Sequence, residues 1–138
     1  MYIQPVAELI KKHEGLRLTA YRCPAGKLTI GSGRNVEQNG ITPSEAEMLL
    51  YNDIQNCYAA CVKFDCWNRL NTARQAVLID MCFNLGIGRL KQFKKMFAAL
   101  SQGDYDKAAA EMLDSVWAKQ VKSRAAQLAE IMRKGEIK

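Results

Sequence analysis

Three residues in the first quarter of this 138-residue chain carry side chains suited to acid–base or nucleophilic chemistry. Glu14 is separated by eight residues from Cys23, which is separated by five from Thr29. A carboxyl group can donate a proton, a thiolate can act as a base or a nucleophile, and a hydroxyl can orient a water molecule. The elements around these residues decide whether the three side chains can meet.

A short helix is predicted over residues 3–14, because its apolar residues recur at helical spacing: Val6, Leu9 and Ile10. Gly15 then ends the helix. Glu14 therefore lies at the C-terminal end, where unpaired carbonyl groups and the helix dipole disfavour a charged carboxylate. A solvated glutamate at a helix end is the alternative interpretation.

A β-hairpin is predicted around Pro24-Ala25-Gly26, because apolar and polar residues alternate on both sides. With a three-residue loop and Gly26 at positive φ, Cys23 pairs opposite Lys27. The side chains of Cys23 and Thr29 then project from the same face of the sheet. A two-residue loop would place them on opposite faces, so this prediction depends on the register.

Two glycines follow the second strand, in Gly31-Ser32-Gly33. They allow a bend of the chain or the close approach of another group to the backbone. No GxGxxG or Walker pattern accompanies them, so the sequence gives only weak support for a phosphate-binding loop.

The rest of the chain is predicted to be helical. A capping box over Thr42–Glu45 opens a long helix over about 42–62, and a second over Thr72–Gln75 opens an apolar helix through Phe83. Further helices fit 90–101, 104–113 and 115–133. The predicted fold class is α+β and mostly helical, as a single domain over 1–138. Its parts are a β-containing lobe at about 15–40, the connecting helix, and a helical lobe at about 63–138 that includes helix 3–14.

Composition narrows the class of protein. Hydrophobic residues make up 49% and charged residues 25% of the chain, as in an ordinary globular domain. No run of 18 apolar residues predicts a membrane span, and the first twelve residues lack the apolar core of a signal peptide. Twenty basic against fourteen acidic side chains give a net charge of +6. That charge favours anionic partners such as nucleic acid, an anionic membrane or cell-wall polymer, or it serves only solubility.

The five cysteines do not predict a metal site. Their number is odd, so they cannot all pair within the chain. Cys57, Cys61 and Cys66 are crowded but form no pair of CxxC motifs, and the single histidine, His13, is far away in sequence. We therefore expect no metal and no cofactor.

Two segments, His13–Cys23 and Gly26–Arg34, resemble the active-site region of the bacteriophage-type lysozymes, the T-even phage endolysin relatives in glycoside hydrolase family 24. The resemblance continues, in the same order, in Ile41–Glu47, Phe83–Gly86, Ser115–Gln120 and Arg124. It implies a two-lobed lysozyme fold that hydrolyses the β-1,4 bond between N-acetylmuramic acid and N-acetylglucosamine in bacterial peptidoglycan.

By the same resemblance, Glu14 is the general acid that protonates the leaving glycosidic oxygen. Position 23 is usually an aspartate that holds the attacking water and stabilises positive charge on the sugar, and Thr29 orients that water. Cys23 departs from this pattern. It can act as a base or electrostatic stabiliser, as a covalent nucleophile, or as a spectator in a cell-wall-binding protein with impaired catalysis. A neutral thiol dominates at pH 7 unless neighbours lower its pKa, and Arg22, Lys27 and Arg34 are the candidates.

Other positions match the family's substrate-binding cleft. Arg124 corresponds to an arginine that approaches the catalytic glutamate, and an exposed arginine is the alternative. Phe83 and Asn84 lie where relatives line the cleft floor, although for Phe83 a buried aromatic residue is the favoured interpretation. Asn35 is placed to contact substrate near the end of the hairpin, and Trp117 is expected to pack.

The resemblance also implies partners and a location. We expect a monomer that acts on peptidoglycan, without stable membrane insertion. It would accumulate in the host bacterial cytoplasm until a holin-type partner permeabilises the membrane. A nucleic-acid-binding module is the competing class, because basic residues cluster at 89–95. No recognition-helix motif accompanies that cluster, so nucleic acid is not the predicted partner.

Overall fold

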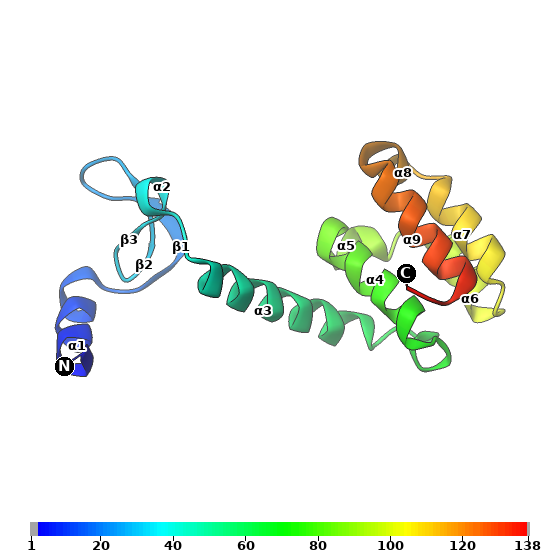
Figure 1. The fold of residues 1–138 in the computed structure, drawn as a ribbon, viewed down its shortest axis with the longest axis horizontal. Helices are drawn as coiled ribbons and strands as arrows, with labels where there is room; N and C mark the ends of the chain where they lie inside the picture. The colour runs from blue at the N-terminus through cyan, green and yellow to red at the C-terminus, as the bar shows by residue number, and fades with distance from the viewer. Residues whose placement is uncertain (1–2, 138) are drawn as a thin grey trace. The chain divides into compact units, whose positions relative to one another are not determined.

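The computed structural model describes residues 3–137 and confirms a mainly helical α+β fold (Figure 1). This part of the chain contains nine α-helices, one 3₁₀ helix and one antiparallel three-stranded sheet. It divides into two compact units, residues 1–48 and 49–138, which are described separately below. None of the helices in the described range combines the length and the apolar character needed to cross a membrane.

The first unit carries the whole sheet. Its elements are α1 (Ile3–Glu14), β1 (Arg17–Arg22), β2 (Leu28–Gly31), β3 (Arg34–Asn35), α2 (Val36–Asn39) and the first turns of α3 (Pro43–Cys61). The strands lie in the order β1-β2-β3. As its sequence predicts, the N-terminal helix α1 ends at Glu14.

The hairpin has the three-residue loop that places Cys23 and Thr29 on one face. The Cys23 amide donates to the Lys27 carbonyl at 3.0 Å, and Thr29 pairs with Tyr21 across the strands. Gly26 adopts a φ of 80° and donates its amide to the Cys23 carbonyl at 2.7 Å. The predicted register is confirmed, because glycine provides the positive φ that this loop requires.

The predicted capping box at the start of α3 is confirmed, and a second interaction reinforces it. The Glu45 amide donates to Thr42 Oγ1 at 3.1 Å, and the Thr42 amide donates to Glu45 Oε1 at 2.8 Å. Arg34 then binds both carboxylate oxygens of Glu45, at 2.8 and 2.6 Å. The guanidinium of Arg34, together with the Thr42 amide, lowers the pKa of Glu45 to about 2. This bidentate ion pair joins the sheet to the start of α3.

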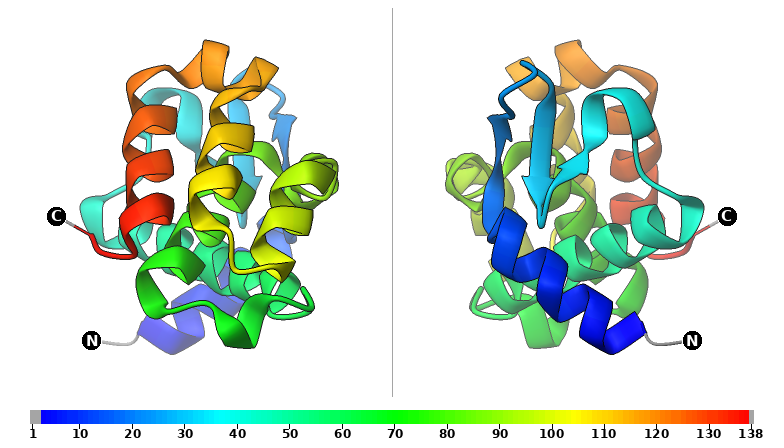
Figure 2. Two further views of the ribbon diagram at one scale, coloured as in Figure 1. Left: turned by 90° about the vertical axis from the view of Figure 1, so that its right-hand side faces the viewer. Right: turned by 90° about the vertical axis from the view of Figure 1, so that its left-hand side faces the viewer.

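The second unit is a bundle of short helices. After α3 come η1 (Trp67–Arg69), α4 (Thr72–Leu85), α5 (Ile87–Leu90), α6 (Lys94–Ser101), α7 (Tyr105–Leu113), α8 (Val116–Val121) and α9 (Ser123–Lys134). Helices α7 and α9 lie side by side, and α6 packs next to α7 (Figure 2). The largest side chains buried between them are Leu78, Met81, Leu90, Met96, Leu100, Met112 and Met132.

Three predicted features of this unit are wrong. The helix expected at 90–101 begins only at Lys94, because Leu90 ends α5 and a turn follows, and the helix expected at 115–133 is divided into α8 and α9. The second division occurs at Lys122, which has a φ of 46° and so cannot continue a helix. The N-cap of α4 is Asn71 rather than Thr72, because Asn71 Oδ1 accepts from the Arg74 amide at 3.0 Å.

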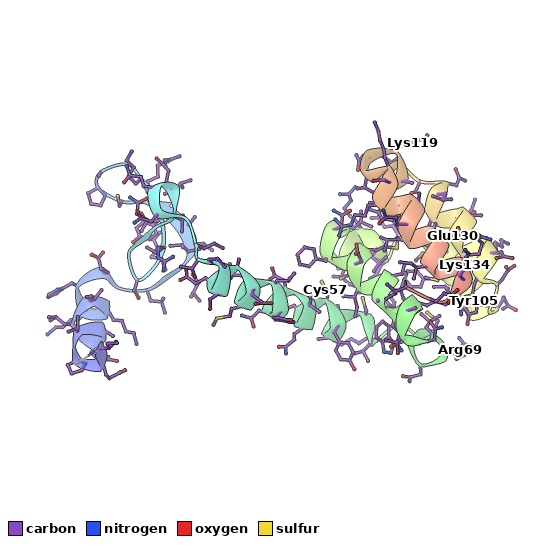
Figure 3. All side chains as sticks on the ribbon, in the orientation of Figure 1. Cys57, Arg69, Tyr105, Lys119, Glu130 and Lys134 are labelled. Atoms are coloured by element: carbon purple, nitrogen blue, oxygen red, sulfur yellow. The ribbon has the colours of Figure 1, made fainter. Side chains whose placement is uncertain are left out.

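Arg74 joins α4 to the C-terminal end of α9. Its guanidinium donates to the Met132 carbonyl at 2.7 Å and to the Arg133 carbonyl at 3.0 Å, and it stacks 3.5 Å over the Tyr105 ring. Figure 3 shows Tyr105 near Lys134, the last residue of α9. The Arg74 side chain thus satisfies two carbonyl groups that the end of α9 leaves unpaired. Through these bonds and its stacking on Tyr105, Arg74 connects α4, α7 and α9.

The Arg34–Glu45 pair predicts an acid-dependent loss of stability. Folding lowers the pKa of Glu45 from its ordinary 4.5 to about 2, so its contribution is complete above pH 4.5 and is lost as the pH falls through 2. We expect the melting temperature of the wild type to fall more steeply between these pH values than that of Glu45→Gln. Thermal unfolding followed by circular dichroism measures this.

The control for this experiment is Glu47→Gln, on the exposed surface of the same helix. It should retain the pH dependence of the wild type. Parallel pH profiles for wild type and Glu45→Gln would contradict the assignment.

Candidate active site

The Glu14 side chain lies against the turn between β2 and β3. Helix α1 ends at Glu14, and the Gly15 amide donates to the Lys11 carbonyl at 2.8 Å as the chain leaves the helix. A Cβ atom built on Gly33 would lie 3.0 Å from both Cδ and Oε2 of Glu14. Gly33 therefore permits the close approach that the sequence allowed, and the group that approaches is the carboxyl of Glu14.

The Cys23 sulfur is surrounded by polar groups of its own hairpin. The side chain is half-buried and the thiol is free. The backbone N–H of Lys27 is the main cause that lowers the pKa of Cys23. The Ala25 N–H and the Thr29 hydroxyl add to this effect, and partial burial opposes it. A lowered pKa increases the thiolate fraction at a given pH.

The cations that the sequence suggested for this effect bind elsewhere. Arg22 and Lys27 both lie near the carboxylate of Glu37, at 3.3 and 3.7 Å, and Arg34 binds Glu45. These carboxylates neutralise the positive charges. The prediction that cationic side chains lower the pKa of Cys23 is therefore wrong, and backbone amides take that role.

Thr29 is the polar residue that the first unit buries most completely, with 3% of its surface exposed. Its hydroxyl donates to the Lys27 carbonyl at 2.8 Å and also lies within hydrogen-bonding reach of the Cys23 sulfur. A hydroxyl has one proton, so it serves one of these acceptors at a time. The structure thus brings Cys23 and Thr29 together.

Glu37 is a residue of this site that the sequence analysis missed. From helix α2 it accepts the Leu28 amide at 3.2 Å and the Arg22 guanidinium at 3.3 Å, and its other oxygen pairs with Lys27. One carboxylate therefore ties both strands of the hairpin beside the Cys23 loop. The only signal in the sequence is an acidic residue between two basic segments, which is too common to identify such a role.

Asn35 has a structural role beside this site. Its Oδ1 accepts the Gln38 amide at 3.0 Å, which caps α2, and its Nδ2 donates to Gln38 Oε1 at 3.0 Å. Asn35 also pairs with Thr29 across the sheet. Its cap places Glu37 over the hairpin, while the predicted contact with substrate stays a prediction.

The second unit holds three of the predicted binding residues, Phe83, Asn84 and Arg124. Within the second unit Phe83 is 44% exposed, because α4 turns its Leu78 and Met81 face to the core, and its predicted place in the cleft floor stays a prediction. Asn84 Oδ1 accepts from Trp117 Nε1 at 2.7 Å, which confirms a packing role for the tryptophan. Arg124 binds Asp80 at 2.6 Å, and its predicted approach to Glu14 stays a prediction.

Comparison with known proteins identifies the family. The model of the family described as phage lysozyme matches residues 11–135. This chain belongs to the phage lysozyme family. Its enzyme class is therefore that of the lysozyme-type glycoside hydrolases.

Relatives within and outside phages support this assignment. An endolysin of Acyrthosiphon pisum secondary endosymbiont phage 1 is 33% identical over 80% of this chain and 75% of its own length. The pre-baseplate central spike protein Gp5 of Enterobacteria phage T4 is 29% identical over 96% of this chain, which spans only 28% of the spike protein. Probable T4-type lysozyme 2 of Dictyostelium discoideum is 22% identical over 99% of this chain and 98% of its own length.

The residues that this phage lysozyme domain offers for chemistry contain no group suited to a metal ion. Within residues 3–137, no three histidine, cysteine, aspartate or glutamate side chains lie close enough together to hold one. The polar atoms gathered at the hairpin are instead a thiol, a hydroxyl and backbone amides, while the Glu14 carboxyl lies against the turn at the other end of β2.

The Glu37 contacts predict control over the reactivity of Cys23. Replacing Glu37 by alanine releases the hairpin loop, so the amide donors around the sulfur become less ordered and the pKa of Cys23 rises. We expect the pH profile of iodoacetamide labelling at Cys23, followed by mass spectrometry, to move to higher pH. Glu37→Gln should move it less, because its amide oxygen still accepts the Leu28 amide.

Labelling can be assigned to Cys23 because other thiols are less reactive. Burial, with the neighbouring Cys82, raises the pKa of Cys57 to about 11 and that of Cys61 to about 12. Glu47→Ala is the matched control and should label like the wild type. An unchanged profile in Glu37→Ala would contradict a positioning role for Glu37.

Proposed function

We propose that this chain is an endolysin that hydrolyses the β-1,4 bond between N-acetylmuramic acid and N-acetylglucosamine in bacterial peptidoglycan. In this proposal Glu14 is the general acid, and Cys23 and Thr29 manage the attacking water and the developing charge. The observation that carries it is the hydrogen-bonded environment of Cys23, which favours the thiolate at the position of the family's aspartate. The family match and the relative named endolysin support the reaction class.

The proposed reaction is a single displacement. The Glu14 carboxyl transfers its proton to the glycosidic oxygen, and the bond from that oxygen to the anomeric carbon breaks. A water molecule attacks the same carbon from the opposite face and gives a proton to the Cys23 thiolate. The product then has inverted configuration. The thiol proton and the Glu14 carboxylate return to their starting states through solvent.

Thr29 has a geometry suited to orienting that water. Its hydroxyl is fixed by burial and by the short bond to the Lys27 carbonyl, so its oxygen lone pairs can accept from a water beside the Cys23 sulfur. When the sulfur is a thiolate, the hydroxyl can donate to it instead. The Thr29 hydroxyl would thus change its hydrogen-bond acceptor when the Cys23 thiol ionises.

Two further features fit this function. A net charge of +6 attracts the chain to anionic cell-wall polymers and raises encounter rates. We further propose that the protein acts as a monomer, accumulates in the host cytoplasm, and reaches peptidoglycan after a holin-type partner permeabilises the membrane. Stable membrane insertion and nucleic-acid binding have no part in this proposal.

A wall-binding protein with impaired catalysis is the second candidate. It is favoured by one observation, the thiol at a position where the family has a carboxylate. A thiol with an ordinary pKa is mostly neutral at pH 7 and supplies little negative charge. The two candidates therefore differ in whether Cys23 ionises in the working pH range.

Replacement of Glu14 by glutamine should abolish hydrolysis, because the amide cannot donate a proton to the leaving oxygen. We expect a loss of at least about 100-fold in the clearing of chloroform-treated cells and of purified peptidoglycan, with unchanged circular dichroism. Glu8→Gln, on the exposed surface of α1, should retain activity. Clearing that survives Glu14→Gln would remove Glu14 from the role of acid.

Substitutions at Cys23 separate the candidates. We expect Cys23→Asp to be active and Cys23→Ala to be weaker than the wild type by about 10–100-fold, because alanine cannot accept a proton. The acid limb of the kcat/KM profile should lie at lower pH in Cys23→Asp, since an aspartate ionises near pH 4 and a thiol at a much higher pH.

NMR of the product anomers tests the stereochemistry of the same reaction. Inversion supports the displacement by water, whereas retention would indicate a covalent bond to the sulfur. Equal activity in Cys23→Ala and the wild type would make Cys23 a spectator. A wild type that binds peptidoglycan without cutting it would favour the second candidate.

A further inference from the structure

Gly33 is the residue whose backbone meets the Glu14 carboxyl. A Cβ atom at position 33 would lie 3.0 Å from Cδ, 3.0 Å from Oε2 and 3.1 Å from Cγ of Glu14. These separations are shorter than normal carbon–carbon and carbon–oxygen contacts. Any residue other than glycine must therefore displace either the turn or the carboxyl.

The turn itself is firmly held. Ile30 pairs with Arg34 across β2 and β3, and Arg34 binds both the Gly40 carbonyl, at 3.1 Å, and the Glu45 carboxylate. By contrast, Glu14 is an exposed residue at the end of α1, and its carboxyl is the far end of a flexible side chain. The carboxyl would therefore move before the turn does.

Gly31 provides an internal comparison. Gly31 has a φ of 71° and Gly33 a φ of 86°, so both need the left-handed region that other residues rarely adopt. Apart from Gly31 itself and its two chain neighbours, no residue has an atom within 4 Å of a Cβ built on Gly31. The two glycines thus share the backbone requirement, but only Gly33 contacts Glu14.

We propose that Gly33 is a positioning residue for the general acid, and that its bare Cα is the surface that sets where the Glu14 carboxyl lies. This inference rests on the proposed role of Glu14. The contact restricts the carboxyl on the side that faces Gly33 and so limits the directions in which it can deliver a proton. A methyl group at position 33 would rotate or shift the carboxyl away from that position.

Kinetics of matched variants test the role in the reaction. We expect Gly33→Ala to lower kcat on peptidoglycan by up to about 10-fold with little change in KM, because the Glu14 carboxyl must give way by a few tenths of an ångström. Gly31→Ala should retain kcat, although it should also lose some thermal stability because of its positive φ. Gly33→Asn tolerates positive φ better than alanine but still carries a Cβ, so its stability should recover while kcat stays low.

A stability cycle tests the contact without using activity. In the wild type, Gly33→Ala should lower the melting temperature more than Gly31→Ala, because only it crowds Glu14. With Glu14→Ala as background, the two glycine variants should lower it equally. This cycle keeps its meaning even if Glu14→Gln shows that Glu14 is not the acid, so failure of the proposed function and failure of this inference are distinguishable.

Two results would overturn the inference. One is a kcat for Gly33→Ala and Gly33→Asn equal to that of Gly31→Ala. The other is an excess loss of stability in Gly33→Ala that persists unchanged when Glu14 is alanine.

Discussion

The hairpin loop at 23–27 is the constraint on which the rest of the candidate site depends. Its three-residue length and the positive φ of Gly26 fix the register that places Cys23 and Thr29 on one face. The same loop directs backbone N–H groups toward the sulfur. Register and electrostatics thus have one cause, because the loop conformation that fixes the register also directs the Lys27 and Ala25 N–H groups toward the sulfur.

Charged side chains stabilise this arrangement from outside the site. Glu37 holds both strands of the hairpin, and Glu45 holds Arg34 at the end of the glycine turn. Each carboxylate neutralises cations that the sequence alone would assign to Cys23. The local potential at the sulfur is therefore set by dipoles of the rigid backbone, whose positions vary less than those of long basic side chains.

In the helical unit, polar contacts fix helix ends that the apolar pattern leaves undefined. Arg74 satisfies the last carbonyls of α9, and Asn71 caps α4 while its Nδ2 donates to the Gly135 carbonyl. These interactions connect residues about 60 positions apart. They explain why helix existence was predictable here and helix boundaries were not, since a break such as that at Lys122 leaves no mark in the hydrophobic spacing.

The sequence by itself determined the helix ending at Glu14, the hairpin register, the capping box of α3 and the resemblance to phage lysozymes. These depend on local backbone chemistry, on glycine and proline positions and on short-range caps, all of which are present within a few residues. The tertiary structure alone decided which carboxylate each arginine binds, which face of α4 is buried, and that Gly33 rather than Gly31 meets Glu14. Those outcomes depend on contacts between segments far apart in the chain, whose partners no local pattern can specify.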